Sequence, residues 1–91
     1  MHISILGTGY VGLVTGACFA EFGLHVTCMD VDPTRIEKLE KGEVPFYEPG
    51  LTELVIKGKK SGNLKFTTDL NTALDTALVI FIAVGTPSQP D

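Results

Sequence analysis

The sequence feature that most constrains the fold is a group of three glycines, Gly7, Gly9 and Gly12, between an apolar run and a segment with helical periodicity. Residues 3–6 are apolar apart from one serine, which is typical of a buried parallel strand that feeds a tight turn. Residues 10–22 then predict a helix, which ends before a glycine in the position of a C-terminal cap. The chain is therefore expected to open with a strand–turn–helix unit.

Two stripes of side chains run along this first helix. One is apolar and contains Val11, Val14, Cys18 and Phe22; the other contains small residues at every fourth position, Gly12, Gly16 and Ala20. The two cysteines, Cys18 and Cys28, lie in a helix-like and a strand-like segment, without C-x-x-C spacing or a nearby histidine. We therefore expect both to be reduced residues of the core and expect no metal site.

A second strand and a second helix follow. Residues 25–29 are rich in β-branched and apolar types and predict a strand that closes at Asp30. Asp32 and Pro33 indicate a helix start, because an aspartate caps free N–H groups and proline suits the first helical position. We expect this helix to end at Gly42.

A loop, a third helix and a third strand come next. Residues 43–50 contain two prolines and a glycine and predict a structured loop. The third helix is expected to start at Leu51 and to be terminated by Gly58 and Gly62. Residues 64–67 predict a short strand.

The last predicted elements complete an alternating pattern. Thr68 or Asp69 is expected to cap a brief helix that ends at Asp75. The apolar residues 78–84 are suited to a strand covered on both faces. The order β-α-β-α-α-β-α-β predicts an α/β fold, a Rossmann-type doubly wound parallel sheet with right-handed connections and strand order 3-2-1-4. Because this order leaves the fourth strand as an uncovered edge, we expect residues 1–91 to be the truncated, N-terminal part of one domain in a longer protein.

Composition and charge exclude several partners. The 91 residues carry 11 acidic and 7 basic side chains, a formal net charge of −4, and no Lys or Arg precedes Arg35. A basic patch for nucleic acid is therefore not expected. The N-terminus lacks the positive region of a secretory signal, and the longest apolar run, residues 77–84, is far shorter than the ~20 residues that cross a bilayer. We expect a cytoplasmic protein without a membrane partner.

The three glycines form the pattern G-x-G-x-x-G, which binds the pyrophosphate of a dinucleotide when it joins a strand to a helix. Gly7 allows the sharp turn, Gly9 lets the backbone approach the pyrophosphate, and Gly12 lets the helix pack closely on the strand. A glycine turn without a ligand is the ordinary alternative, and the residue at the end of the second strand argues against it.

The start of the first helix supplies donors for such an anion. The N–H groups near Tyr10 and Val11 have no partner within the helix, and the helix dipole adds positive potential there. We expect the whole turn, Thr8 included, to contact the cofactor.

Asp30 ends the second strand about 20 residues after the glycine turn, where the adenosine ribose of a dinucleotide lies. A carboxylate there accepts hydrogen bonds from ribose hydroxyls and repels a 2′-phosphate, which favours NAD over NADP. Arg35 lies five residues further on and is a basic group that an NADP enzyme could use, although the Asp30 carboxylate would oppose NADP binding. The ordinary alternatives are a turn acid for Asp30 and a solvated helix residue for Arg35.

Thr86 follows the fourth strand at the same carboxyl edge of the sheet, where its hydroxyl could reach the cofactor. A turn residue before Pro87 is an equally good interpretation. His2 and His25 stand at strand starts, on the opposite edge, and are expected to be structural. No nucleophile, general base or metal cluster can be assembled from the remaining residues, so we assign no catalytic residue and no metal ligand.

Three stretches together resemble the N-terminal part of the UDP-glucose/GDP-mannose dehydrogenase family, over essentially the whole chain. They are residues 1–23 with Gly-Tyr-Val-Gly-Leu-Val, residues 45–51 with Pro-Phe-Tyr-Glu-Pro-Gly-Leu, and residues 81–87 with Phe-Ile-Ala-Val-Gly-Thr-Pro. The Tyr-Glu-Pro-Gly-Leu loop is the most telling of these, because ordinary Rossmann enzymes lack it. The sequence leaves open whether Tyr47 and Glu48 do more than shape this loop.

The resemblance implies that the full-length protein oxidises the C6 alcohol of UDP-glucose to a carboxylate, in two hydride transfers to two NAD molecules, through a thioester on a cysteine. It places cofactor contacts on the glycine turn with Val11, and on Asp30, Arg35 and Thr86. It also implies that the catalytic cysteine, in a Gly-Gly-Ser-Cys setting, and its helper lysine, glutamate and threonine come after this chain. Neither cysteine here is in that setting, so we expect the chain alone to bind NAD without catalysis.

Three functions remain open at this point. The first is an excised piece of an enzyme that acts on UDP-glucose, and the second is a piece of a sister 6-dehydrogenase that acts on GDP-mannose or a UDP-N-acetylhexosamine. The third is a free-standing NAD-binding module without chemistry. The glycine stretch and the Tyr-Glu-Pro-Gly-Leu loop favour UDP-glucose, which would bind only to the full-length protein. We expect that protein to be a homo-oligomer.

Overall fold

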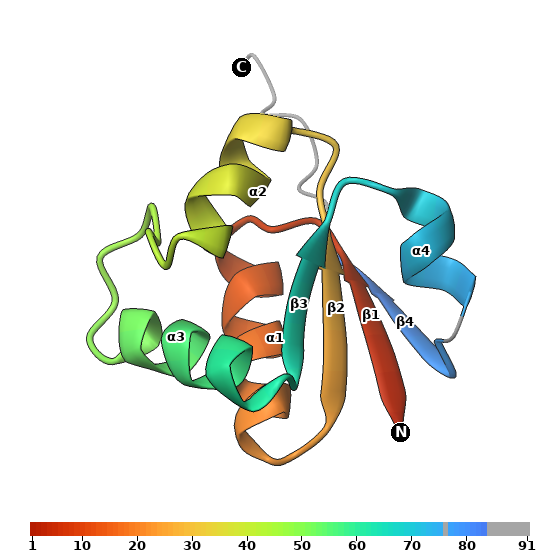
Figure 1. Ribbon diagram of the computed structural model, residues 1–91, viewed down its shortest axis with the longest axis horizontal. Coiled ribbons are helices and arrows are strands. Elements are labelled where there is room, and N and C mark those ends of the chain that lie inside the picture. The colour runs from red at the N-terminus through yellow and green to blue at the C-terminus, as the bar shows by residue number, and fades with distance from the viewer. Residues whose placement is uncertain (76, 84–91) are drawn as a thin grey trace, which may run out of the picture.

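The computed structural model describes residues 1–75 and 77–83, which form a four-stranded sheet with helices on both faces (Figure 1). The strand order is β3-β2-β1-β4, and all three neighbouring pairs are parallel. The predicted α/β class, the Rossmann-type parallel sheet and the order 3-2-1-4 are confirmed.

The two central strands lie between two edge strands. The strands are β1 (His2–Leu6), β2 (His25–Met29), β3 (Leu64–Thr67) and β4 (Val79–Ile82). Successive residues of β1 point to opposite faces, because side chains alternate along a strand. Ile3 and Ile5 enter the main core, whereas the Ser4 hydroxyl donates a hydrogen bond to the Ala73 carbonyl on the other face. Both faces of β1 are therefore covered.

Helices α2 and α4 start at the predicted capping residues. The helices are α1 (Tyr10–Glu21), α2 (Pro33–Glu40), α3 (Leu51–Ser61) and α4 (Leu70–Asp75). Asp32 accepts hydrogen bonds from two backbone N–H groups in the first turn of α2. Asp69 accepts one from the Asn71 N–H at 3.1 Å, so Asp69 is the capping side chain at the start of α4. Gly23 follows the end of α1 with a φ of +92°, as expected of a C-terminal cap.

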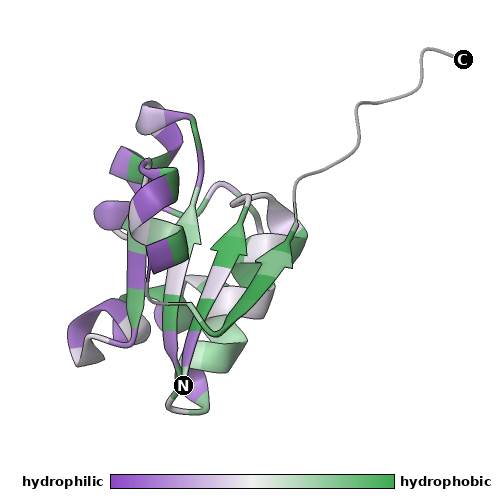
Figure 2. Cartoon of the chain, turned by 90° about the vertical axis from the view of Figure 1, so that its right-hand side faces the viewer, coloured by the Kyte–Doolittle hydropathy of each residue, from purple (hydrophilic) through white to green (hydrophobic). Residues whose placement is uncertain are grey.

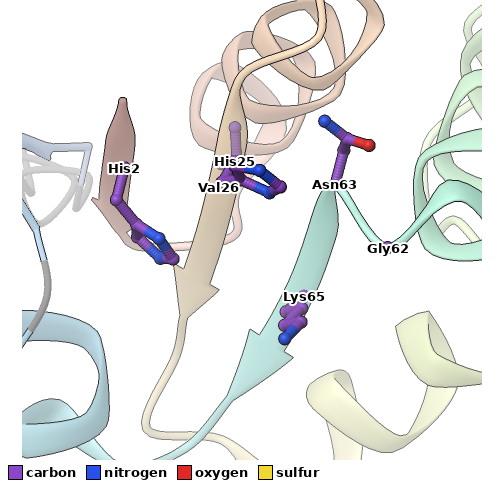
Figure 3. Close-up of a pocket in the computed structure, with 6 residues that line it drawn as sticks. All are labelled: His2, His25, Val26, Gly62, Asn63 and Lys65. Atoms are coloured by element: carbon purple, nitrogen blue, oxygen red, sulfur yellow. The ribbon is translucent and has the colours of Figure 1, made fainter.

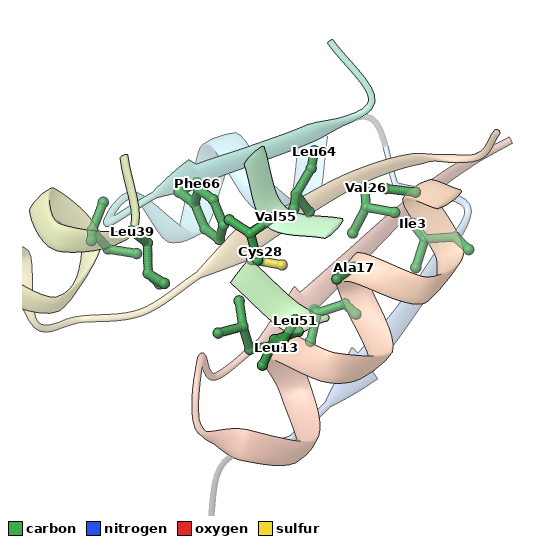
Figure 4. Packing of buried hydrophobic residues seen from close by; sticks show 13 residues of the cluster. Ile3, Leu13, Ala17, Val26, Cys28, Leu39, Leu51, Val55, Leu64 and Phe66 are labelled. Atoms are coloured by element: carbon green, nitrogen blue, oxygen red, sulfur yellow. The ribbon is translucent and has the colours of Figure 1, made fainter. Parts of the chain in front are cut away.

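The main core lies between the sheet and helices α1 and α3 (Figure 4). Helix α1 faces this core with its small residues: Gly12, Gly16 and Ala20 are buried, together with Leu13 and Ala17. A Cβ on Gly16 would lie 2.7 Å from the Cys28 Sγ, which is closer than Cβ contacts in proteins. The small-residue stripe therefore sets how closely α1 packs on β2.

The expectation that both cysteines belong to the core is wrong for Cys18. Because α1 packs through its small residues, most of the larger apolar stripe faces outward: Val14 is half-buried against the core, but Cys18 is exposed, and Phe22 is 81% exposed. Cys28 is buried in β2 as expected, and burial raises the pKa of its thiol to about 12. Both cysteines are free thiols.

The expectation that Gly58 helps to terminate α3 is also wrong. Gly58 lies inside the helix and is buried. A Cβ there would lie 2.8 Å from the Leu64 Cβ and 3.4 Å from the Ala20 Cβ, so the missing side chain lets α3 pack on β3 and α1. Gly62, with a φ of +80°, ends the helix alone.

Strand β4 forms an exposed apolar edge of the sheet. Its four residues are 37% to 73% exposed, and the strand is apolar along its length (Figure 2). The Phe81 ring stacks on Phe19 of α1 with centroids 5.4 Å apart. Within the described residues β4 is therefore not covered on both faces, contrary to that expectation, whereas the predicted uncovered edge is observed. The predicted strand end at residue 84 lies outside the described residues.

None of the helices in the described part of the chain combines the length and the apolar character needed to cross a membrane.

Candidate functional site

The glycine turn connects the carboxyl end of β1 to α1 near the centre of the sheet. Gly7 has a φ of +113°, which residues with side chains rarely adopt, and its N–H donates to the Met29 carbonyl at 2.7 Å. A Cβ on Gly12 would lie 2.0 Å from the Gly7 carbonyl oxygen, so only glycine permits this approach of α1 to the turn. A Cβ on Gly9 would have no atom within 4 Å, so open space lies beside the turn at this residue.

Helix α1 begins with backbone donors that no side chain caps. Gly9 is the N-cap residue and has no side chain to accept a hydrogen bond, while its carbonyl accepts from the Leu13 N–H at 2.9 Å and closes the first helical turn. The first N–H groups of a helix, here those of Tyr10, Val11 and Gly12, have no partner within it, and the helix dipole makes this end positive. Together with the open space at Gly9, these donors form a site suited to an anion.

Asp30 lies directly after β2, beside the glycine turn. Its Oδ2 accepts hydrogen bonds from the Thr8 N–H at 3.0 Å and the Thr8 hydroxyl at 2.7 Å, and its Oδ1 accepts one from the Asp32 N–H at 3.0 Å. Burial alone would raise the pKa of Asp30. The hydrogen bonds from Asp32 and Thr8 and the charge of Arg35 outweigh burial, so the pKa lies below its usual value. At neutral pH the site therefore contains an ionised carboxylate in a fixed orientation.

Thr8 differs from Tyr10 and Val11 in its burial and in its hydrogen bonds. It is fully buried, and both its N–H and its hydroxyl donate to Asp30. Tyr10 and Val11, by contrast, are exposed at the start of α1. The sequence predicted all three as contacts within the turn. The structure brings Thr8 to Asp30, and leaves Tyr10 and Val11 at the surface beside the open space.

Arg35 also joins the site. Its Nη1 lies 3.5 Å from the Asp30 Oδ2, and its side chain is 43% exposed. A cavity of about 220 Å³ adjoins this ion pair and is lined by Asp32, Thr34, Arg35, Lys38 and Pro45. The Asp30 carboxylate and the Arg35 guanidinium are thus direct partners, and Arg35 also lines a hollow between α2 and the following loop.

The loop formed by residues 43–50 contributes a contact that the sequence analysis did not find. The Tyr10 hydroxyl donates to the Glu48 Oε1 at 2.6 Å, and the Tyr10 and Phe46 rings form a T-shaped pair with centroids 5.7 Å apart. The hydrogen bond to Glu48 and the negative charge of Glu48 raise the pKa of Tyr10. Tyr47, next to Glu48, is 99% exposed. No short sequence pattern predicts this contact, because Tyr10 and Glu48 are 38 residues apart in sequence.

The histidines lie at the far edge of the sheet, as predicted. A cavity of about 250 Å³ opens there, at the amino ends of the strands, and its lining is His2, His25, Val26, Gly62, Asn63 and Lys65 (Figure 3). The two imidazole rings stack with centroids 6.2 Å apart, and the His2 Nε2 lies 3.0 Å from the Thr27 Oγ1. This cavity is separate from the glycine turn, which lies at the carboxyl end of β1.

Two further predictions concern Thr86 and metal ligands. Thr86 lies outside the described residues. Across residues 1–75 and 77–83, no three His, Cys, Asp or Glu side chains come together as potential metal ligands.

Comparison with known protein families assigns the chain to one of them. The family model described as UDP-glucose/GDP-mannose dehydrogenase family, NAD binding domain, matches residues 1–91. The chain belongs to this family. Its cofactor is therefore NAD, and the described residues fit a dinucleotide: glycines leave room at the turn, uncapped N–H groups face that room, and a fixed carboxylate lies beside it.

This NAD-binding domain is similar to curated dehydrogenases along almost its whole length. It is 54% identical over 89 residues to a UDP-glucose 6-dehydrogenase of Rhizobium meliloti (strain 1021) and 50% identical over 91 residues to UDP-glucose 6-dehydrogenase YwqF of Bacillus subtilis (strain 168). The alignments cover 98% and 100% of this chain, but 20% and 21% of the relatives. The chain thus spans about one fifth of the length of these proteins.

Solved structures of the family have the same fold as this NAD-binding domain. A GDP-mannose dehydrogenase from Pseudomonas aeruginosa, solved as a ternary complex, superposes with a TM-score of 0.93 at 43% identity, over 99% of this chain and 21% of that one. A UDP-glucose dehydrogenase from Pyrobaculum islandicum gives a TM-score of 0.91 at 42% identity, with the same two coverages of 99% and 21%. Enzymes named for different sugar nucleotides are therefore equally similar in this region.

Proposed function

We propose that residues 1–91 form the N-terminal part of the NAD-binding domain of a longer UDP-glucose 6-dehydrogenase, which oxidises UDP-glucose to UDP-glucuronate with two NAD. The observation that carries the cofactor part is the ionised Asp30 carboxylate beside the open glycine turn. The named substrate rests on relatives that are 54% and 50% identical to this chain. NAD, when bound, supplies the hydride acceptor for the oxidation of an alcohol.

The pyrophosphate is proposed to lie over Gly9, where the N–H groups of Tyr10 and Val11 donate to it. Gly7 and Gly12 shape this part of the site by allowing the turn and the close approach of α1. Each of these proposed contacts uses backbone atoms of the turn.

The adenosine ribose is proposed to donate a hydrogen bond to Asp30. A carboxylate has about four acceptor positions, and among the described residues the two groups of Thr8 and the Asp32 N–H occupy three. The remaining position is on Oδ1. Thr8 then acts by orienting Asp30, and Arg35 balances its charge at the rim of the site. Thr86 is proposed as a further cofactor contact on the basis of sequence alone.

The chain by itself is proposed to bind NAD without completing the reaction. Its buried thiol, Cys28, has a pKa near 12 and stays protonated at neutral pH, so it is a poor nucleophile. Its exposed thiol, Cys18, lies about two helical turns along α1 from the glycine turn. The groups that act on the sugar are therefore proposed to lie elsewhere in the protein.

A second candidate substrate is GDP-mannose, because the Pseudomonas aeruginosa enzyme named for it superposes with a TM-score of 0.93. A UDP-N-acetylhexosamine is a third, because a UDP-N-acetyl-mannosamine dehydrogenase from Staphylococcus aureus superposes with a TM-score of 0.88. NADH formation by the full protein with each sugar nucleotide separates them. If none of the three supports NADH formation, the enzymatic proposal falls and a binding module takes its place. Light scattering of the same protein tests the proposed homo-oligomer.

Calorimetric titration of NAD and NADP tests the cofactor assignment. We expect NAD to bind more tightly than NADP, because the Asp30 carboxylate accepts from a ribose hydroxyl and repels a 2′-phosphate. Asp30→Ala should narrow the difference, mainly by weakening NAD binding. Asp75→Ala, which removes an exposed carboxylate from the end of α4, is the matched control and should leave both affinities unchanged. Equal affinities for the two cofactors in the unmodified protein would rule out the ribose assignment.

A further inference from the structure

The start of α1 is held in place by a neighbouring loop. Gly9 offers no capping side chain, so the first turn of the helix lacks a side-chain cap. Tyr10, the first residue of α1, instead reaches the loop of residues 43–50. Its hydroxyl donates to the Glu48 Oε1 at 2.6 Å, and its ring meets Phe46 edge to face. The hydrogen bond is short and ends on a carboxylate, but both residues are exposed, so its expected net strength is that of a typical protein hydrogen bond.

The loop of residues 43–50 is held in place by contacts on both sides of Tyr47. On one side, Phe46 packs against the buried core. On the other, the Glu48 carbonyl accepts a hydrogen bond from the Leu51 N–H at 3.0 Å, and Leu51 is buried. Gly50, with a φ of +85°, makes the bend between them. The Glu48 side chain is thus presented to Tyr10 from a braced segment.

We propose that Glu48 is a positioning residue for NAD: through Tyr10 it holds the first turn of α1 so that its free N–H groups face the pyrophosphate. The inference rests on the proposed function, since it takes the pyrophosphate to bind at this turn. It gives the Tyr-Glu-Pro-Gly-Leu loop a role in cofactor affinity beyond its own shape. In this proposal Glu48 acts through its hydrogen bond with the Tyr10 hydroxyl, without contacting the cofactor itself.

A direct electrostatic role for Glu48 makes the opposite prediction. A carboxylate close to a bound pyrophosphate would repel it, so removing the charge would strengthen NAD binding. Glu48→Gln separates the two effects, because the amide oxygen still accepts from the Tyr10 hydroxyl while the charge is gone. Tyr10→Phe makes the complementary change, because it removes the hydroxyl and keeps both the ring and the charge.

The experiment measures the affinities of NAD and of adenosine, which lacks the pyrophosphate, in the full protein. Tyr10→Phe and Glu48→Ala should each weaken NAD binding about fivefold, the effect of one hydrogen bond of typical net strength. Adenosine affinity should change less than twofold in both. Glu48→Gln should stay within twofold of the unmodified protein for NAD. The control is Tyr47→Phe, which removes a hydroxyl from the adjacent, exposed residue and should change nothing.

Three results would overturn the positioning role. Unchanged NAD affinity in Tyr10→Phe would show that the hydroxyl does not matter. A parallel loss of NAD and adenosine affinity would indicate a general loss of structure. Tighter NAD binding in Glu48→Gln would indicate repulsion. A failure of the unmodified protein to bind NAD at all would instead refute the proposed function.

Discussion

Asp30 joins three segments of the chain with one side chain. Its carboxylate accepts from Thr8 in the glycine turn and from Asp32 at the start of α2, and it pairs with Arg35 one turn further on. The side chain is only 12% exposed, so water replaces these partners poorly. The residue therefore contributes to folding as well as to the proposed ribose contact, and the two contributions respond differently to pH and to substitution.

Acid should remove the folding contribution of Asp30. Because the folded-state pKa is lowered, this contribution is fully present above the ordinary value of 3.8 and is lost as pH falls from there through the folded-state pKa. In Asp30→Asn the contribution is absent at all pH values. The variant should thus be less stable than the unmodified protein at pH 7, and the difference should shrink below pH 4. Urea unfolding across this range measures it; a difference that does not depend on pH would contradict the lowered pKa.

Alanine at two glycines of the turn should have opposite consequences. Gly12→Ala places a Cβ 2.0 Å from the Gly7 carbonyl oxygen, so it should destabilise the fold by about 1–3 kcal/mol, as overpacking does. Gly9→Ala meets no atom within 4 Å and has an ordinary φ of −68°, so the loss of stability should be below about 1 kcal/mol. Its methyl group occupies the proposed pyrophosphate space, however, and NAD affinity should fall. Thermal unfolding and calorimetry together check the pair, and a stable Gly12→Ala would contradict the close approach.

At the scale of whole elements, α1 depends on glycine for its distance from the sheet. Gly16→Ala raises helix propensity by up to about 1 kcal/mol, yet its Cβ would lie 2.7 Å from the Cys28 Sγ. We expect net destabilisation by Gly16→Ala and partial rescue by Cys28→Ala, which removes the opposing sulfur. Chemical denaturation of the two single variants and the double variant gives the coupling, expected at roughly 1 kcal/mol or more. Additive effects would show that the two residues do not meet.

The sequence predicted correctly those features that depend on residues close together in the chain. The bounds of β2 and β3, the Asp32 cap and the Gly23 stop depend on a few neighbouring residues, and the structure confirms them. The glycine turn and Asp30 were also predictable, because a short pattern followed at a fixed distance by an acid carries its own geometry.

The misses depend on contacts that no local pattern encodes. Which stripe of α1 enters the core is decided by the sheet, so Cys18 was assigned to the wrong side. Gly58 looked like a helix stop, because its reason for being glycine lies on β3 and α1. The contact from Tyr10 to Glu48 spans 38 residues and has no signal along the chain.

At the scale of the whole molecule, β4 is an exposed apolar edge strand, which favours association between chains. Its residues are apolar and 37% to 73% exposed, and an edge strand also presents unpaired backbone groups. We expect the isolated 91-residue polypeptide to self-associate as its concentration rises. Ile82→Lys, at the most exposed position of β4, should shift this association to higher concentration. Light scattering over a concentration series measures both, and a clean monomer at high concentration in the unmodified polypeptide would refute the expectation.

The strand order also affects the order in which the strands can pair during synthesis and folding. β1 is the first strand of this chain to leave the ribosome, yet it lies between β2 and β4 and pairs as far along as Ile82. Pairing across so long a loop is slow, because the entropy of closing the loop is lost before the contact forms. The glycine turn follows directly after β1, and β1 gains its second neighbouring strand only when β4 has been synthesised. The glycine turn is thus synthesised early, but the sheet around it is complete only after β4 has paired with β1.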